Sequence, residues 1–338
     1  MEFKYHIIVP INYLHINFED SIQIEGKGEL IHGSKLVPLL ASNPIYLLEL
    51  GHRTAGMYIN NSWVFYLKFK SPTNLSHAQI SAYLDNFISR CAAWIGKLWY
   101  HLDNNCFINK GFLLNQTEPS TLTVYREGIH SKANDEFHNT TLTKNDILRF
   151  EAFTKYVLLN ALNPPNTEIK FVESTIGAVV YPVQMNFMKY DYNRLFRADN
   201  FITNARYTGI MISKITNYMS ALECLFTTKS HDATITVTNR ASHFIEGKPE
   251  EVARYAKDIK TAYNIRSRFL HGDKIKMLPE DIKDLCIEID GHMRKIMNKA
   301  VLNIPENNVF HITETEGGKK RFEKQFNDFG KLCPTSNL

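Results

Sequence analysis

Hydrophobic and polar positions follow one pattern in the first half of the chain and another in the second. In the first half, apolar runs rich in β-branched and aromatic residues are separated by turn residues, which is typical of β-strands. The runs lie at residues 4–18, 21–33, 45–50, 57–70, 106–114, 121–127 and 167–183. We expect a strand or hairpin in each of them, so the first half predicts a β-sheet.

Two segments of the first half have helical spacing instead. After Ser76, apolar residues recur at steps of three and four as far as Trp99, which predicts an amphipathic helix with Ser76 as its N-cap. Thr143, followed by Asp146, opens a second helix, and Pro164 ends it because proline cannot continue a helix.

From about residue 190 the pattern becomes almost entirely helical. Pro249 at a first helical position and Gly272 at the end bound one helix. Pro279 opens the next in the same way. We expect further helices at 194–228 (one long helix or a broken pair), 234–247 (despite its β-branched residues) and 316–332. The second half therefore predicts an all-α bundle of four or five helices.

These patterns predict an α+β protein with two domains, as a length of 338 residues also indicates. We expect a mixed domain of helices and strands over 1–188 and a helical domain over 189–338, with the boundary between Pro182 and Arg194. The N-terminal residues read as a strand and not as a signal peptide.

Cysteine usage and hydropathy indicate the compartment. The five cysteines are widely spaced and form no CxxC pair, which argues against a zinc ribbon or a disulfide framework. No apolar stretch approaches the length of a membrane span. We therefore expect a cytoplasmic protein without membrane contact.

The net charge of +4 is compatible with a nucleic-acid partner but does not require one.

The segment with the most candidate catalytic side chains is YNIRSRFLHGD, residues 263–273. Because a helix turns about 100° per residue, Ser267 and His271 share a face, and Arg266 lies about 140° from His271. The long side chain of Arg266 still reaches the same helix end.

A polar cluster at a helix C-terminus has a defined chemistry. The helix dipole favours a cationic His271, whereas Arg266 and Arg268 oppose it, so this histidine is expected to titrate near neutrality. An arginine fork binds phosphate and stabilises a pentacoordinate transition state. No acidic pair accompanies the cluster, so we expect neither a metal ion nor a cofactor. These groups suit metal-independent phosphodiester cleavage of RNA, whose 2′-hydroxyl is the nucleophile.

The Arg266-x4-His271 spacing within this helix resembles the ribonuclease motif of HEPN domains, most closely the Apea-like group. The resemblance covers roughly residues 200–300. It includes SALECLF (220–226), NRASHFI (239–245) and KTAYNIRSRFLHGD (260–273).

That resemblance implies a compact helical bundle that dimerises, so that two motifs form one composite active site. Active members cut RNA without metal, leave a cyclic phosphate, and serve in toxin–antitoxin pairs or in abortive infection against phage. It also implies roles for individual residues. Arg266 and His271 would be catalytic, and Ser267, Tyr263 and Glu223 would support them. Apart from the resemblance, Arg268 is a further candidate for a supporting residue, and Arg240 and Lys274 are candidates for contacts with RNA.

Other interpretations stay open. Residues 266–271 are also compatible with a solvated helix end whose basic residues complement the dipole. Glu223 is equally compatible with a structural carboxylate, and Arg240 with an ordinary surface arginine. The helical half would then be a non-catalytic RNA-binding or dimerisation module, or would signal for an N-terminal half that senses a ligand or phage protein. The sequence leaves open whether the RNA is a tRNA or an mRNA, and whether a phage-derived trigger or an antitoxin exists.

Overall fold

The chain is an α+β protein that combines an antiparallel sheet with a set of helices. The computed structural model describes residues 2–18, 20–51, 55–56, 62–126, 128–162, 172–173, 179–180, 193–227, 233–245, 247–302, 310 and 316–330. Two compact units divide the chain. The sheet unit comprises residues 1–130, 137–151 and 167–185, and the helical unit comprises the rest.

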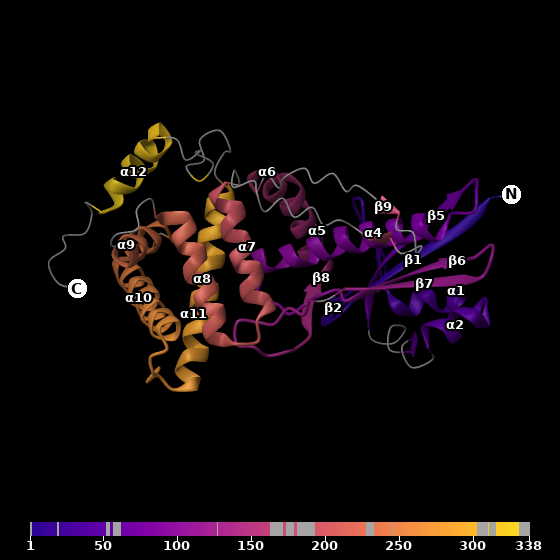
Figure 1. The fold of residues 1–338 in the computed structure, drawn as a ribbon, viewed down its shortest axis with the longest axis horizontal. Helices are drawn as coiled ribbons and strands as arrows, with labels where there is room; N and C mark the ends of the chain where they lie inside the picture. Colours follow the sequence, from indigo (N-terminus) through magenta and orange to yellow (C-terminus); the bar gives the residue numbers. More distant parts are fainter. Residues whose placement is uncertain are drawn as a thin grey trace. The chain divides into compact units, whose positions relative to one another are not determined.

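A six-stranded antiparallel sheet forms the centre of the sheet unit, with strand order β3-β4-β5-β1-β6-β7 (Figure 1). Its strands are β1 (Phe3–Ile11), β3 (Ile22–Ile24), β4 (Gly28–His32), β5 (Trp63–Ser71), β6 (Lys110–Asn115) and β7 (Ser120–Tyr125). Two short pairs add β2 (Leu14–Asn17) with β8 (Thr140–Thr143), and β9 (Val172–Glu173) with β10 (Val179–Val180).

Both faces of the sheet are buried, and this explains the nearly continuous apolar run of β1. Alternate residues of a strand point to opposite faces. Ile7 and Val9 join a core with helix α4 (His77–Lys97), whereas Ile8 joins a second core with the short helices α1 (Val37–Ala41) and α2 (Pro44–Leu50). A strand covered on two sides has no polar face, so its sequence does not alternate.

The helix α4 begins where its capping residue predicts. Ser76 accepts a hydrogen bond from the backbone of Gln79, and the Gln79 side chain accepts one from the backbone of Ser76, which is a capping box. Trp94 and Trp99 are buried within the sheet unit.

The strand prediction for residues 45–50 is wrong, because this segment is helix α2. The Asn43 side chain accepts the Ile45 N–H at 2.9 Å, and Pro44 occupies the first turn. Both are helix-start signals. A six-residue apolar run does not distinguish a strand from a helix by its periodicity, so the flanking residues decide.

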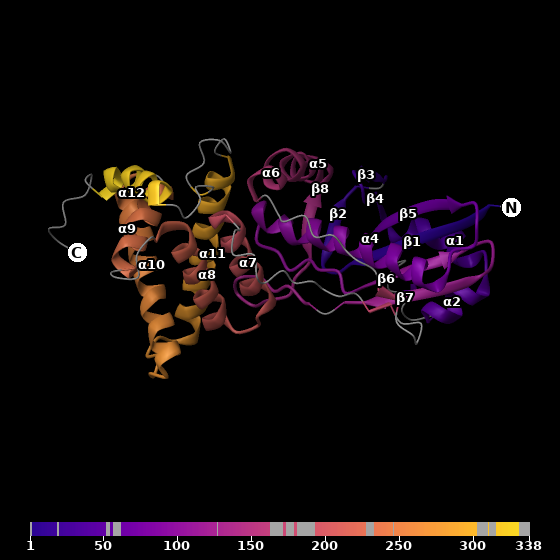
Figure 2. The same ribbon diagram turned by 45° about the horizontal axis from the view of Figure 1, so that its top comes forward.

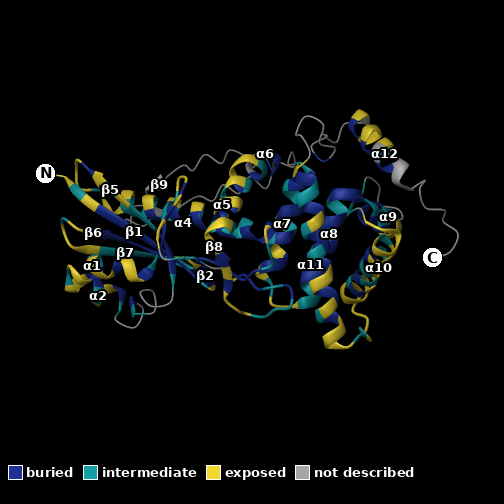
Figure 3. Ribbon diagram, turned by 180° about the vertical axis from the view of Figure 1, so that it is seen from behind, coloured by how far each residue is buried: buried dark blue, intermediate teal, exposed yellow. Residues whose placement is uncertain are grey.

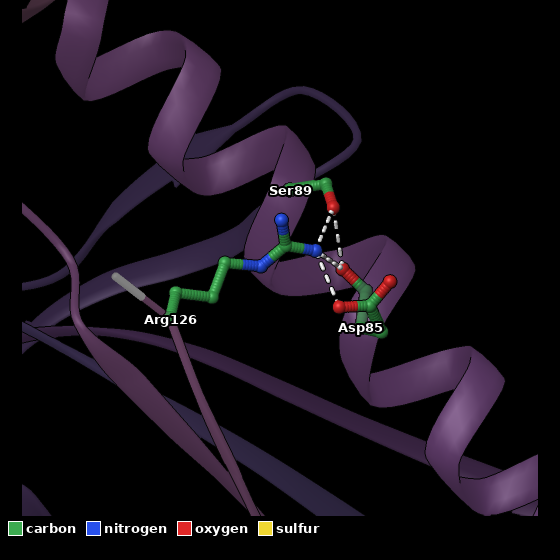
Figure 4. Close-up of polar contacts among 3 residues, drawn as sticks. All are labelled: Asp85, Ser89 and Arg126. Carbon is green, nitrogen blue, oxygen red and sulfur yellow. Dashed lines mark hydrogen bonds and ion pairs between the residues drawn. The ribbon is translucent and has the colours of Figure 1, made fainter. Parts of the chain in front are cut away.

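A polar cluster of Asp85, Ser89 and Arg126 fastens the end of β7 to α4 (Figure 4). Nη2 of Arg126 donates to the carboxylate of Asp85, to the Asp85 carbonyl oxygen at 3.3 Å and to the Ser89 hydroxyl at 2.5 Å. One guanidinium group thus joins two elements of the same unit, which indicates a structural role.

The helical unit is built from helices that lie side by side in both Figure 1 and Figure 2. They are α7 (Arg194–Tyr207), α8 (Met211–Phe226), α9 (Ala233–Ile245), α10 (Pro249–His271) and α11 (Pro279–Leu302), with α12 (Glu316–Gly330) packed on α9. The pattern at 194–228 is therefore a broken pair, interrupted at Thr208–Ile210. In Figure 3 buried residues run along α8, which contacts α7, α9, α10 and α11.

Segments from the first half of the chain also belong to the helical unit. They are Ser131–Glu136 and the described residues of 152–162, where helix α5 (Lys144–Phe153) continues as a π-helix (Thr154–Leu158) and α6 (Leu159–Leu162). The buried Lys214 of α8 donates to the Ser131 hydroxyl at 2.5 Å and thereby ties one such segment to the bundle. The boundary predicted at 188/189 lies outside the described residues.

Among the described residues, no helix is both long and apolar enough to serve as a membrane span.

Candidate functional site

The C-terminal end of α10 carries the predicted motif, and its termination is defined by Gly272. This glycine has φ = +77°, in the left-handed region that favours glycine. The N–H of Asp273 donates to the Arg268 carbonyl at 2.8 Å, and that of Gly272 donates to the Phe269 carbonyl at 3.3 Å. This Schellman arrangement satisfies the last carbonyls and makes His271 the final helical residue.

Arg266 is held against the neighbouring helix α8 by Glu223. Its Nη1 donates to Oε1 of Glu223 at 2.7 Å, and its Nη2 donates to Oε2 at 3.2 Å, a bidentate pairing. Each side chain is 24% exposed. The guanidinium is therefore fixed in orientation but keeps contact with solvent.

Tyr263 lies one turn before Arg266 and is buried. The guanidinium carbon of Arg266 is 5.9 Å from the centre of the Tyr263 ring, which is within the range of a cation–π contact. Burial, and then the negative charge of Glu223, hold the pKa of the Tyr263 hydroxyl far above its usual range. This tyrosine remains protonated and is unsuited to act as a base near neutral pH.

The rest of the predicted cluster lies in solvent. Residues 267–274, which include Ser267, Arg268, His271 and Lys274, are all exposed. Nη1 of Arg268 donates to the Lys274 carbonyl at 3.2 Å and braces the turn after the helix. Within the part of the chain that the structure describes, His271 makes no hydrogen bond or ion pair. The structure thus joins Arg266 with Glu223 and Tyr263, and leaves His271 in solvent at the helix end.

Arg240 does not lie at the surface, and this corrects the expectation that it is a surface arginine available to RNA. It is buried in α9, where Nη1 donates to the Phe226 carbonyl at 2.7 Å and Nη2 donates to Glu323 at 2.5 Å. Arg194 likewise donates to the Cys224 carbonyl at 2.9 Å. Because the last carbonyls of a helix lack intrahelical donors, the two arginines cap α8, and Arg240 has no part in the candidate site.

Two polar contacts between helices of the helical unit, centred on Asp290 and on His292, are not indicated by the sequence pattern. Asp290 of α11 accepts a hydrogen bond from the Tyr218 hydroxyl at 2.7 Å and pairs with Arg294. Nε2 of His292 lies 3.0 Å from Oδ2 of Asp258 on α10. The four-residue spacing of Asp290 and Arg294 is visible in the sequence, but the partners on other helices are set by packing.

Comparisons with models of known protein families, with curated proteins and with solved structures found no match for this chain. The assignment of an activity therefore depends on the motif residues and on the geometry around them.

Proposed function

We propose that this chain is a HEPN-type endoribonuclease that cleaves RNA without a metal ion, as a homodimer in the cytoplasm. The bidentate pairing of Arg266 with Glu223 is the observation that supports this most strongly. The resemblance to the Apea-like HEPN group implies a carboxylate on an earlier helix that orients the motif arginine. On the same resemblance, the biological role is that of a toxin or an abortive-infection effector against phage.

Arg266 has the donors that phosphate recognition requires. A guanidinium has five N–H donors, and Glu223 accepts two of them. Each Nη atom retains one further hydrogen, and the side chain is partly exposed. Arg266 would donate these hydrogens to the dianionic phosphorane, while Glu223 holds the guanidinium in place.

His271 is accessible to a large substrate because its helix ends at Gly272 and its side chain is in solvent. In the proposed reaction an imidazole removes the proton of the 2′-hydroxyl, and the 2′-oxygen attacks the adjacent phosphorus. The bond to the 5′-oxygen breaks, and an imidazolium protonates that oxygen. The products are a 2′,3′-cyclic phosphate and a 5′-hydroxyl.

The two histidine roles are the reason for proposing a dimer. One imidazole must accept a proton while another group donates one, and the motif supplies one histidine per chain. A second copy would contribute the second His271 and complete the site. The exposed Ser267, Arg268 and Lys274 would then lie close to the RNA backbone and add to its binding.

Cleavage of total RNA in the presence of EDTA tests the proposal. Wild-type protein should produce fragments with cyclic phosphate ends, and His271→Ala and Arg266→Ala should abolish cleavage. His77→Ala and Arg254→Ala are matched controls, because both residues are exposed and Arg254 lies on the same helix as the motif. Circular dichroism checks that each variant is folded. Retained cleavage by a folded His271→Ala or Arg266→Ala variant would contradict the assignment.

A second candidate is a non-catalytic HEPN module that binds RNA or dimerises, with the sheet unit as a sensor of a ligand or phage protein. The absence of a hydrogen bond between Arg266 and His271 within the described chain favours it. This candidate predicts no cleavage in EDTA, retained RNA retardation in gels, and normal growth on overexpression. Co-purification of a phage protein with the sheet unit would point to sensing.

A further inference from the structure

A separate group of metal-ligating side chains lies between α10 and α11. It consists of Asp258, Glu288 and His292, and one ligand atom of each lies within 4.8 Å of the other two. Asp258 precedes Arg266 by about two helical turns, so this group is distinct from the motif at the end of α10. Among the described residues, no other set of three such side chains meets this criterion.

The local arrangement follows from helix geometry and packing. Glu288 and His292 are four residues apart on α11 and therefore share a face of that helix. Asp258 reaches the same point from α10, with Oδ2 at 3.0 Å from Nε2 of His292. The ring of Tyr255 packs edge-on against His292 at 4.6 Å between centroids and fixes the imidazole plane.

We infer that Asp258, Glu288 and His292 bind one divalent transition-metal ion, with Zn²⁺ as the best fit to one nitrogen and two oxygen donors. Zinc–nitrogen and zinc–oxygen bonds are about 2.0 to 2.2 Å long, so two ligands of a tetrahedral ion lie about 3.3 to 3.6 Å apart. The Asp258–His292 separation of 3.0 Å is a hydrogen-bond distance and would widen slightly around an ion. Glu288 is exposed and is free to approach by a change of rotamer, and water completes the coordination.

The electrostatics of the group also favour a cation. Two carboxylates, from Asp258 and Glu288, meet one imidazole, and Nε2 of His292 carries the proton that the Asp258 carboxylate accepts. A metal ion bound here would displace this proton and take its place between the two groups. Lys295 is the opposing cation, and its Nζ is directed to the Tyr255 hydroxyl at 3.1 Å.

An ion held here would clamp α10 to α11 and so stabilise the bundle. Because Asp258 comes from one helix and the other two ligands from the next, the site exists only when the helices are packed together. The role is structural and does not depend on the proposed ribonuclease activity, whose test is made in EDTA.

Metal binding by the full chain tests this inference. Chelator-stripped protein is titrated with Zn²⁺ by calorimetry and with Co²⁺ by visible absorption, and thermal unfolding is followed with and without Zn²⁺. Glu288→Gln is the informative variant because the residue is exposed and its loss should leave the apo fold intact. Glu280→Gln, an exposed change on the same helix, is the control.

Wild type and Glu280→Gln should bind about one Zn²⁺ per chain and unfold at a higher temperature with zinc. Glu288→Gln should bind at least about tenfold more weakly. The Co²⁺ spectrum should lack a sulfur-to-metal charge-transfer band, which excludes the cysteines as ligands. No zinc binding by wild type, equal affinity for Glu288→Gln, or a thiolate band would each overturn the inference.

Discussion

The pairing of Glu223 with Arg266 makes a quantitative prediction about the helical unit. Each side chain is about three-quarters buried, so the pair lies between an exposed ion pair, which contributes about 0 to 1 kcal/mol, and a fully buried one, whose disruption costs about 3 to 5 kcal/mol. Two hydrogen bonds between charged groups, one of 2.7 Å and one of 3.2 Å, are consistent with a value between these limits.

We therefore expect Glu223→Ala to lower the free energy of unfolding by about 1.5 to 3 kcal/mol, because it leaves the partly buried guanidinium unpaired. For a unit of this size, the melting temperature should fall by about 3 to 12 °C. Arg266→Ala should lower the free energy of unfolding by a similar amount. The double variant should lose less free energy of unfolding than the sum of the two single losses.

The measurement is a double-mutant cycle, with urea unfolding followed by far-ultraviolet circular dichroism, which reports mainly on helices. A matched cycle on Lys283 and Glu136, an ion pair of the same unit with side chains 38% and 40% exposed, should give a smaller coupling energy. A coupling energy below about 0.5 kcal/mol for Glu223 and Arg266 would refute the reasoning, since the two changes would then be independent.

Two further predictions concern the sheet unit, where tryptophan fluorescence is the readout because Trp63, Trp94 and Trp99 all lie there. Gly111→Ala should destabilise the unit by about 1 to 3 kcal/mol, because the new Cβ would lie 2.7 Å from Ile88 of α4. Gly96→Ala is the control, because its new Cβ would meet no atom within 4 Å, and it should be neutral or stabilising. Equal effects of the two changes would contradict this account of the packing. Burial lowers the pKa of His6 below its ordinary value of 6.5, so protonation favours the unfolded chain. The free energy of unfolding should therefore be highest above about pH 6.5 and decline as the pH falls below that value. His6→Gln should flatten this decline. An unchanged pH profile in that variant would show that other groups cause it.

Elements with local signals can be predicted from the amino-acid sequence alone. The helix after Ser76 and the limits of α10 at Pro249 and Gly272 follow from residues that cap a helix within one turn of its ends. The change from strands to helices along the chain likewise follows from periodicity, which needs no information about distant residues. The strand prediction at 45–50 is wrong because the Asn43 cap beside the short apolar run specifies a helix.

Which side chains meet across the fold depends on how the helices and strands pack. Arg240 is buried and caps α8 through the Phe226 carbonyl. Ser131 lies against Lys214, and Asp258 lies beside His292. The partners of these pairs lie 14, 83 and 34 residues apart in sequence. Periodicity shows which face of a helix is buried but not which residue of another helix faces it, because contacts at such separations depend on how whole helices pack.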